Sequence, residues 1–456
     1  EQIDALVALY NQGQLEELDQ QANVLLKQFP EAIVLLNILG AANTSLKRFD
    51  AAITHYNHAL KLKPDLAQVH SNLGNAYKQA GNLKASIKSC KRAITLKPSL
   101  AEAHNNLGNA QLETGELDTA IESYGRAIQL KPDYAESHNN LGFAQRKTDN
   151  FAAAIESFRH ALQLKPDYAE AHNNLGTELQ RRGDLGGAIE AYENAIQLKP
   201  DYVGALNNLG NVYIEIEDVD AAIETYQRAI QLKPDYAEIY SNLGKAFLEN
   251  KDLDGAIKSC QQAIEFKPDL AEAYNILGNV HKQKDNLEAA VENYRRAVQL
   301  NPDFADAHYN LGNAFLTLGH FDKALSNYEK ADTPNSFAQC LICLYALGLY
   351  EEFDLRVSEN EDIYKTDITV AAICAFYSNQ TNRKNLHKFC TMPLEFLSFG
   401  QINQHIDNSN DFINRLDEEL KLVPSSWEPY GKATHLGLQT KGNLFGTKTE
   451  CISKLE

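Results

Sequence analysis

The sequence lacks the features that mark a membrane span, a secreted domain or a common catalytic site. No apolar run reaches the roughly 18 residues from which a transmembrane helix is expected, and no signal-peptide pattern is visible. Gly-rich phosphate loops, G-x-S-x-G and H-E-x-x-H are all missing, which excludes the best-known nucleotide, hydrolase and metalloprotease motifs. The chain starts at Glu1 without Met, which leaves open that it is a fragment from which a leader was removed.

Basic residues and paired cysteines are also scarce. Lys and Arg number 43 against 61 Asp and Glu, and the formal net charge is −18. Nucleic acids and anionic membranes need a basic surface, so we expect neither as a main partner. The seven cysteines are an odd number without paired spacing, which is typical of reduced thiols and predicts a cytoplasmic location.

The sequence does have a strict internal period. Nine glycines and nine prolines each recur at a step of 34 residues, with no insertion or deletion. These residues are Gly40, Gly74, Gly108, Gly142, Gly176, Gly210, Gly244, Gly278 and Gly312, and Pro30, Pro64, Pro98, Pro132, Pro166, Pro200, Pro234, Pro268 and Pro302. A period in this range is typical of a chain built by stacking one supersecondary element, which offers a long surface for function.

Each repeat, numbered from seven residues before its glycine, predicts two helices. The nine repeats begin at residues 33, 67, 101, 135, 169, 203, 237, 271 and 305. Places 4, 7, 8 and 11 share one helical face, and places 20, 24, 27 and 28 share another. Small residues at places 8, 20 and 27 let the two helices approach closely. Cys90 and Cys260 stand at place 24, which is otherwise aromatic, and are therefore expected in the core.

Most repeats carry signals for where their helices begin and end. Gly at place 15, as in Gly115, predicts the end of the first helix, and Pro at place 32 predicts the end of the second. Asp after that proline, with Glu three residues later, predicts a capping box at the start of the next first helix, as in Asp133 and Glu136.

These residues resemble the tetratricopeptide repeat (TPR) family. The segment AEAHNNLGNAQLETGELDTAIESYGRAIQLKPDY is close to the consensus of that family, apart from His where Trp is usual. The resemblance implies an all-α, right-handed superhelical α-solenoid of helix-turn-helix repeats whose first helices line the concave side. We expect a degenerate N-terminal capping repeat over 1–32, nine repeats over 33–338, degenerate TPR-like helices over 339–389 and a non-repeat tail over 390–456.

The first helices carry an unusual amount of Asn on places 2, 5, 6, 9, 12 and 13, which point away from the helix-pair core. Asn is a poor residue for a helix interior, and its amide offers two donors and an acceptor. A column of such amides can bind the main chain of an extended peptide whatever its sequence. The TPR array of the O-linked N-acetylglucosamine transferases is similar and uses an asparagine ladder in this way. The candidate peptide-binding residues are Asn72, Asn75, Asn106, Asn109, Asn140, Asn174, Asn208, Asn211, Asn242, Asn279, Asn310 and Asn313.

Structural explanations of the same residues stay open. The asparagines can bridge adjacent repeats, or duplication alone can have copied them. The acidic place 2 is explained by the capping box, and its charge weighs against the chaperone-tail clamps, which are known by basic residues near these places. The place-4 histidines recur too far apart to share one metal ion and are expected to pack in the slot of the consensus Trp. They are His70, His104, His138, His172 and His308.

The tail loses the period from about Phe389 and reads as strand and loop in its second half. The stretch 427–445 resembles the opening of putative 2-oxoglutarate/iron(II)-dependent oxygenase domains that follow TPR arrays. That family needs two His, one carboxylate and an Arg. The H-x-D of His405 and Asp407 precedes the Trp427 motif, and after Asp407 the chain has one His, His435, and one Arg, Arg415.

We therefore interpret His405 and Asp407 as an accidental match and expect no catalytic core and no cofactor. Cys340-x-x-Cys343 has no second cysteine pair and predicts no zinc site. The favoured interpretation is a non-catalytic scaffold that binds protein or peptide clients in a concave groove. The alternative is the substrate-recruiting arm of a modifying enzyme, an oxygenase or, less favoured, a glycosyltransferase, whose catalytic core is absent from this chain. Self-association through the exposed ends of the stack is a third hypothesis.

Overall fold

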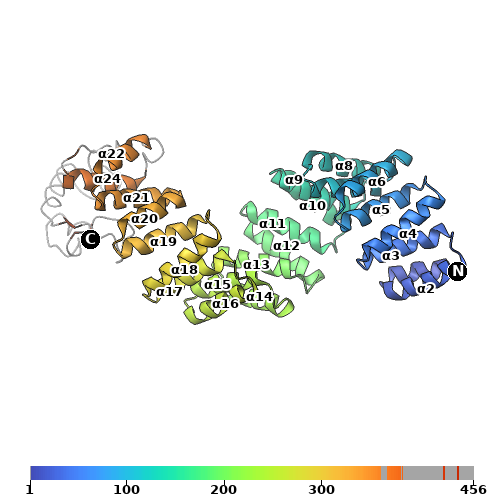
Figure 1. The fold of residues 1–456 in the computed structure, drawn as a ribbon, viewed down its shortest axis with the longest axis horizontal. Coiled ribbons are helices and arrows are strands. Elements are labelled where there is room, and N and C mark those ends of the chain that lie inside the picture. The colour runs from blue at the N-terminus through green and yellow to red at the C-terminus, as the bar shows by residue number, and fades with distance from the viewer. Residues whose placement is uncertain (1, 361–366, 382, 384–424, 427–438, 441–456) are drawn as a thin grey trace, which may run out of the picture. The chain divides into compact units, whose positions relative to one another are not determined.

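The fold is a series of helix hairpins that follow the period of the sequence (Figure 1). The computed structural model describes residues 2–360, 367–381, 383, 425–426 and 439–440. It divides into two compact parts, Glu1–Pro234 and Asp235–Glu456, named here the N-terminal part and the C-terminal part. In each part the described residues up to Thr381 form a stack of helices, which confirms the predicted all-α solenoid.

The N-terminal part holds a leading helix pair and six periodic repeats. The leading pair is α1 (Gln2–Asn11) and α2 (Leu15–Gln28). The first helices of the repeats are α3 (Ile33–Ser45), α5 (Ala67–Gln79), α7 (Ala101–Glu113), α9 (Ala135–Lys147), α11 (Ala169–Arg181) and α13 (Val203–Glu215). The second helices are α4 (Phe49–Leu62), α6 (Leu83–Leu96), α8 (Leu117–Leu130), α10 (Phe151–Leu164), α12 (Leu185–Leu198) and α14 (Val219–Leu232).

The C-terminal part continues the period with three repeats and then departs from it. The first helices are α15 (Ala237–Glu249), α17 (Ala271–Gln283) and α19 (Ala305–Thr317), and the second helices are α16 (Leu253–Phe266), α18 (Leu287–Leu300) and α20 (Phe321–Ala331). They are followed by α21 (Pro334–Ala346), α22 (Tyr350–Glu359) and α24 (Ile368–Thr381). Two short strands, β1 (Ser425–Ser426) and β2 (Gln439–Thr440), pair antiparallel, with Ser425 opposite Thr440.

Glycine at place 8 allows the two helices of a repeat to come into contact. A Cβ atom at Gly108 would lie 2.7 Å from Cε1 of Tyr124, the aromatic residue at place 24 of the same repeat. The ring of Tyr124 is fully buried. Where place 24 is Cys90, the Cβ at Gly74 would lie 2.4 Å from its Sγ, so the predicted core position of this cysteine is confirmed.

The turn at place 15 takes a left-handed backbone in all nine repeats. Four repeats have glycine there, and Gly115, for example, has φ +81°. The other five have non-glycine residues with φ between 55° and 64°, namely Lys47, Asp149, Glu217, Lys251 and Asp285. The predicted end of the first helix is therefore confirmed, and the turn geometry persists where the residue best suited to it is absent.

The predicted capping box of the first helices is wrong. In α9 the N-cap residue is Tyr134, which makes no side-chain cap hydrogen bond, because the helix begins at Ala135 and Asp133 lies one residue too early. Side-chain caps are found instead on the second helices, where Asp184 accepts a hydrogen bond from the N–H of Gly187. Equivalent caps are made by Asn82, Asn150, Asp218, Asp252 and Asn286.

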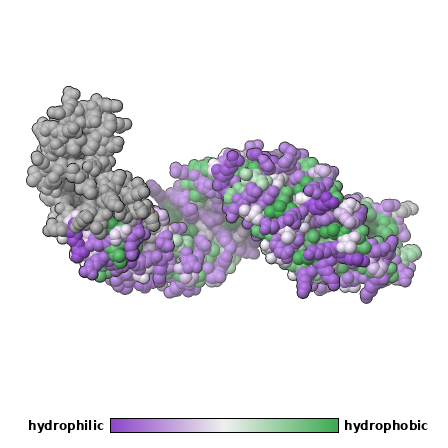
Figure 2. All heavy atoms as spheres, turned by 90° about the horizontal axis from the view of Figure 1, so that it is seen from above, coloured by the Kyte–Doolittle hydropathy of each residue, from purple (hydrophilic) through white to green (hydrophobic). Residues whose placement is uncertain are grey.

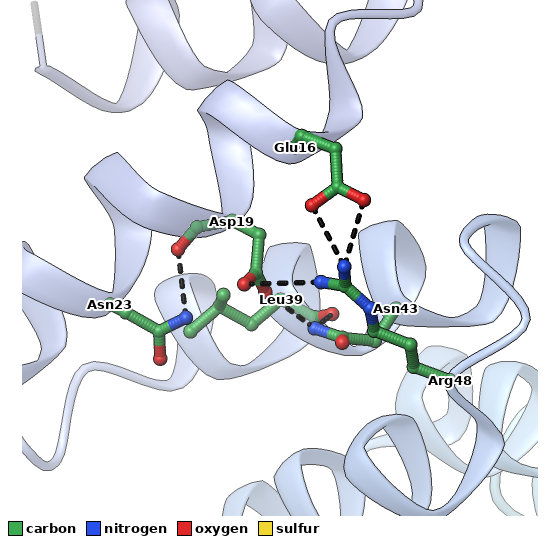
Figure 3. A network of polar contacts seen from close by, with 6 residues as sticks. All are labelled: Glu16, Asp19, Asn23, Leu39, Asn43 and Arg48. Atoms are coloured by element: carbon green, nitrogen blue, oxygen red, sulfur yellow. Dashed lines mark hydrogen bonds and ion pairs between the residues drawn. The ribbon is translucent and has the colours of Figure 1, made fainter.

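The leading helix pair is joined to the first periodic repeat by a polar network as well as by apolar packing (Figure 3). Arg48 places its guanidinium 2.8 Å from Glu16 and 3.6 Å from Asp19. The buried amide of Asn43 donates to Asp19 Oδ1 at 2.8 Å. This network joins residues of α2 to the end of α3; the capping role of 1–32 stays a prediction.

The proline displaced from place 32 of the ninth repeat begins a new helix. Pro334 is the first residue of α21, and Thr333 and Ser336 form a capping box in which each side chain bonds the backbone N–H of the other. Since α21 starts at Pro334, it crosses the predicted boundary between residues 338 and 339. Proline suits this position because its missing N–H needs no partner in the first turn.

The apolar residues of the chain are used mainly inside the stacks. Figure 2 shows hydrophilic side chains interspersed with smaller hydrophobic groups over the face that it displays. Within the residues that the structure describes, no helix is long and apolar enough to cross a membrane.

Two glycine substitutions within one repeat should have opposite effects. Gly108→Ala should lower the free energy of unfolding by about 1–3 kcal/mol, because its Cβ has to displace the buried ring of Tyr124. Gly125→Ala in α8 should raise it by about 0.5–1 kcal/mol, because no atom lies within 4 Å of the new Cβ and alanine favours the helix. Thermal unfolding followed by circular dichroism measures both, and shifts of the same sign would contradict the packing described here.

Candidate functional site

The first helices of successive repeats lie against each other within each part, α5 against α7 and α15 against α17. The surface made by places 2, 5, 6, 9, 12 and 13 of these helices is named here the first-helix face. Two depressions of this face lie between α15 and α17. One is lined by Glu238, Ser241 and Asn242 at the start of the helices, and the other by Asn279 and Gln283 toward their end. The predicted Asn242 and Asn279 therefore border recessed surface.

The place-6 asparagines bridge adjacent repeats. Asn174 Nδ2 donates to Asn139 Oδ1 at 3.0 Å, and Asn208 Nδ2 donates to Asn173 Oδ1 at 3.1 Å. The same bond joins Asn72 to Asn37, Asn106 to Ser71, Asn140 to Asn105 and Asn310 to Asn275. The structural alternative left open by the sequence is thus present: each of these amides uses an N–H to join its repeat to the one before it.

The bridging leaves part of each amide unused. The side chains of Asn140, Asn174 and Asn208 are half-buried, and among the described residues nothing donates a hydrogen bond to their Oδ1 atoms. An amide has two N–H donors and a carbonyl acceptor. Asn174 and Asn208 therefore keep one N–H and the carbonyl oxygen for a ligand, and the bridge fixes the direction in which these groups point.

Place 9 serves the core of its own repeat. The buried Tyr124 donates its hydroxyl hydrogen to Asn109 Oδ1 at 2.8 Å, and the same bond links Tyr226 to Asn211, Tyr294 to Asn279 and Tyr328 to Asn313. Where place 24 is Phe158 and has no hydroxyl, place 9 is Phe143. These asparagines therefore accept the hydrogen bond of a buried tyrosine hydroxyl, a role that was not predicted from the sequence. Asn75 belongs to the repeat in which place 24 is Cys90, so this repeat has no tyrosine hydroxyl at place 24 to donate to it.

The place-4 histidines hold the turn between repeats. Nε2 of His104 lies 3.1 Å from the carbonyl oxygen of Pro98, and His70, His138, His172 and His308 make the same contact with the preceding proline. Because a carbonyl only accepts, Nε2 carries the hydrogen. Burial lowers the pKa of His104 and His138, which favours the neutral ring. The place-4 histidines, predicted to pack in the core, thus also make a specific hydrogen bond to the turn before their helix.

Comparison with known families identifies the repeat. The TPR repeat model matches eight overlapping segments, which together extend over more than half of the chain: residues 40–81, 74–115, 109–149, 146–181, 176–216, 210–251, 244–285 and 278–319. The chain belongs to the TPR repeat family. TPR arrays are protein-interaction scaffolds, and this level of function follows from the family.

Several solved structures are similar to parts of this TPR chain. The crystal structure of MamA is 28% identical, covers 36% of this chain and 97% of its own, and has a TM-score of 0.34. Cut9–Hcn1 from the APC/C is 18% identical, with coverage of 66% and 59% and a TM-score of 0.49. YrrB, described as a TPR protein with an unusual peptide-binding site, is 21% identical, with coverage of 40% and 95% and a TM-score of 0.34. The comparison with curated proteins gives no match.

The predictions for the tail lie outside the described residues, apart from the strand pair of Ser425–Ser426 and Gln439–Thr440. His405, Asp407, Arg415 and His435 are among the residues not described, so the resemblance to an oxygenase stays a prediction. Cys340 and Cys343 are buried free thiols, and burial raises the pKa of each to about 12. Among the described residues no group of three or more His, Cys, Asp or Glu side chains could hold a metal ion.

One buried carboxylate departs from the pattern of the TPR repeats. Glu178 stands at place 10, where the other repeats have Ala or Val. Its side chain is fully buried, and neither carboxylate oxygen has a hydrogen-bond partner among the residues that the structure describes. Its neighbour is Arg146 of the preceding repeat, with Nε 3.6 Å from Oε1. Comparing place 10 across the nine repeats would have revealed this residue from sequence.

The pKa of Glu178 is raised because the cost of burial exceeds the attraction of Arg146 and Arg181. The folded pKa thus lies above the unfolded value, and the ionised carboxylate destabilises the fold at neutral pH. This penalty is complete above the folded pKa and is lost as the pH falls toward the unfolded value of about 4.3.

Glu178→Gln should therefore unfold at a higher temperature than the parent chain at pH 7, and the difference should shrink as the pH falls through the folded pKa. Thermal melts of both chains from acidic to neutral pH measure it. Glu190→Gln is the matched control, because it changes an exposed carboxylate of α12, and it should shift the melting temperature little. A lower melting temperature for Glu178→Gln at neutral pH would contradict the sign worked out here.

Proposed function

We propose that the first-helix face of this TPR chain binds extended protein segments through their main chain. The observation that carries the proposal is the column of bridged amides at place 6, in which Asn140, Asn174 and Asn208 each keep an unused carbonyl oxygen on half-exposed surface. A bridged amide is already ordered before a ligand arrives. Binding therefore costs little side-chain entropy.

The spacing of the amides suits an extended chain. Packed helices lie about 8–10 Å apart, and an extended strand rises about 3.3 Å per residue. Successive place-6 amides can thus meet the main chain about every third residue, whatever the side chains are. This supports a binding mode that tolerates many sequences.

The proposal is tested by two matched triple variants. Asn140, Asn174 and Asn208 changed together to Ala should abolish binding to unrelated peptides of about twelve residues, the length that four amide spacings need. The control changes Asn105, Asn139 and Asn173 to Ala. It removes these place-5 acceptors, while Asn140 keeps its bond to Asn109, and it leaves the place-6 amides on the first-helix face.

Binding of both variants to a synthetic peptide array, with circular dichroism to confirm that they fold, gives the comparison. The Kd of the control variant should rise by less than about tenfold, because a tenfold change corresponds to about the free energy of one hydrogen bond. An equal loss of peptide binding in both triple variants would mean that the amides act only through the stacking of repeats. Unchanged binding by the Asn140, Asn174 and Asn208 variant would show that the place-6 amides do not bind peptides.

A further inference from the structure

The junction between α9 and α11 differs in charge from its neighbours. In this fold place 12 of one first helix faces place 13 of the next. Lys78 lies 3.3 Å from Glu113 at one such junction, and Gln180 donates a hydrogen bond to Glu215 at another. At the α9–α11 junction the corresponding residues are Arg146 and Arg181. Two guanidinium groups thus occupy the places where two other junctions put a polar or basic residue opposite a carboxylate.

The surroundings of these arginines hold them in defined positions. The Arg146 guanidinium lies 4.3 Å from the ring centroid of Phe143, and that of Arg181 lies 4.2 Å from the ring centroid of Phe151. Nζ of Lys147 lies 5.6 Å from the Phe143 centroid. Stacking on an aromatic ring leaves the N–H edge of a guanidinium directed outward and available to an acceptor.

The positive charge at this junction is only partly compensated. Among the described residues Glu178 is the one carboxylate paired with Arg146, it is buried beneath the surface, and Arg181 forms no ion pair. Two guanidinium groups therefore face one buried carboxylate, on a chain whose net charge is −18. Burial lowers the pKa of Arg146, and the positive charge of Arg181 lowers it further. A second anion between the two guanidinium groups would relieve their repulsion.

We propose that Arg146 and Arg181 form a subsite on the first-helix face that takes the carboxylate of an Asp or Glu side chain from the bound segment. Arginine forks match a carboxylate through paired N–H bonds. Arg181 stands seven residues after Asn174 on α11, two turns further along the same face. Its guanidinium lies on the ring of Phe151, the first residue of α10. This inference rests on the function proposed above and adds a preference to it.

The test uses two fluorescent peptides of about twelve residues built from Ala, Ser, Thr and Gly, one with a central Glu-Glu pair and the other with Gln-Gln in its place. Fluorescence anisotropy gives Kd for each at low salt. The parent chain should bind the Glu peptide about tenfold more tightly, as expected for charge-assisted hydrogen bonds. The net charge of the chain disfavours acidic peptides, so such a preference has to come from a local site.

Arg181→Glu should abolish the preference, because it recreates at this junction the pairing of Lys78 with Glu113, and circular dichroism checks that the variant folds. Arg146→Gln is a second variant that should also remove the preference. Lys88→Glu makes the same change of charge on the exposed side of α6, where most other repeats have Glu at the same place, and it should keep the preference.

The outcomes separate the two proposals. If the parent chain binds both peptides equally, the carboxylate subsite is overturned, while the proposed main-chain binding by the place-6 amides stands. If the parent chain binds neither peptide, both the proposed main-chain binding by the place-6 amides and the carboxylate subsite are overturned. A preference that survives Arg181→Glu and Arg146→Gln, or binding of a phosphoserine peptide without binding of the Glu peptide, also overturns the carboxylate subsite.

Discussion

The contact between the glycine at place 8 and the side chain at place 24 is the constraint on which the rest of the structure depends. The two helices of a repeat reach their close packing only because Gly108 has no Cβ to meet the ring of Tyr124. The buried tyrosine then needs an acceptor for its hydroxyl, and Asn109 supplies it from the first-helix face. In the repeat where the ring is Phe158, that requirement disappears and Phe143 takes the place. Core packing thus decides part of the surface chemistry.

The place-6 asparagines connect the stacking of repeats with the proposed binding. Each uses an N–H to bond the repeat before it, as Asn174 does with Asn139. The rest of the amide stays on the first-helix face. The structural and functional explanations of the asparagine column are therefore compatible, because the bond that joins the repeats also orients the groups that would meet a peptide. At the α9–α11 junction Arg146 and Arg181, stacked on Phe143 and Phe151, make the first-helix face locally positive and aromatic.

The sequence predicted the helices well because the period places glycine at a close contact in every repeat, as at Gly108, and at the turn in four of them, as at Gly115. The start of the first helices was predicted wrongly, since Asp133 and Glu136 have the spelling of a capping box but the helix begins too late for it. Partners across repeats, such as Asn139 for Asn174, depend on the distance between helices, which a single period does not encode. Glu178 was missed because a residue that differs in one repeat adds nothing to a periodic pattern.

A crystal structure of this chain with a bound peptide from the array would locate the ligand directly. We expect the peptide main chain to lie along the first-helix face, within hydrogen-bond distance of the Oδ1 or Nδ2 atoms of Asn140, Asn174 and Asn208, while the bridges between repeats persist. A peptide bound on the second helices, or one that touches this face through side chains alone, would contradict this expectation.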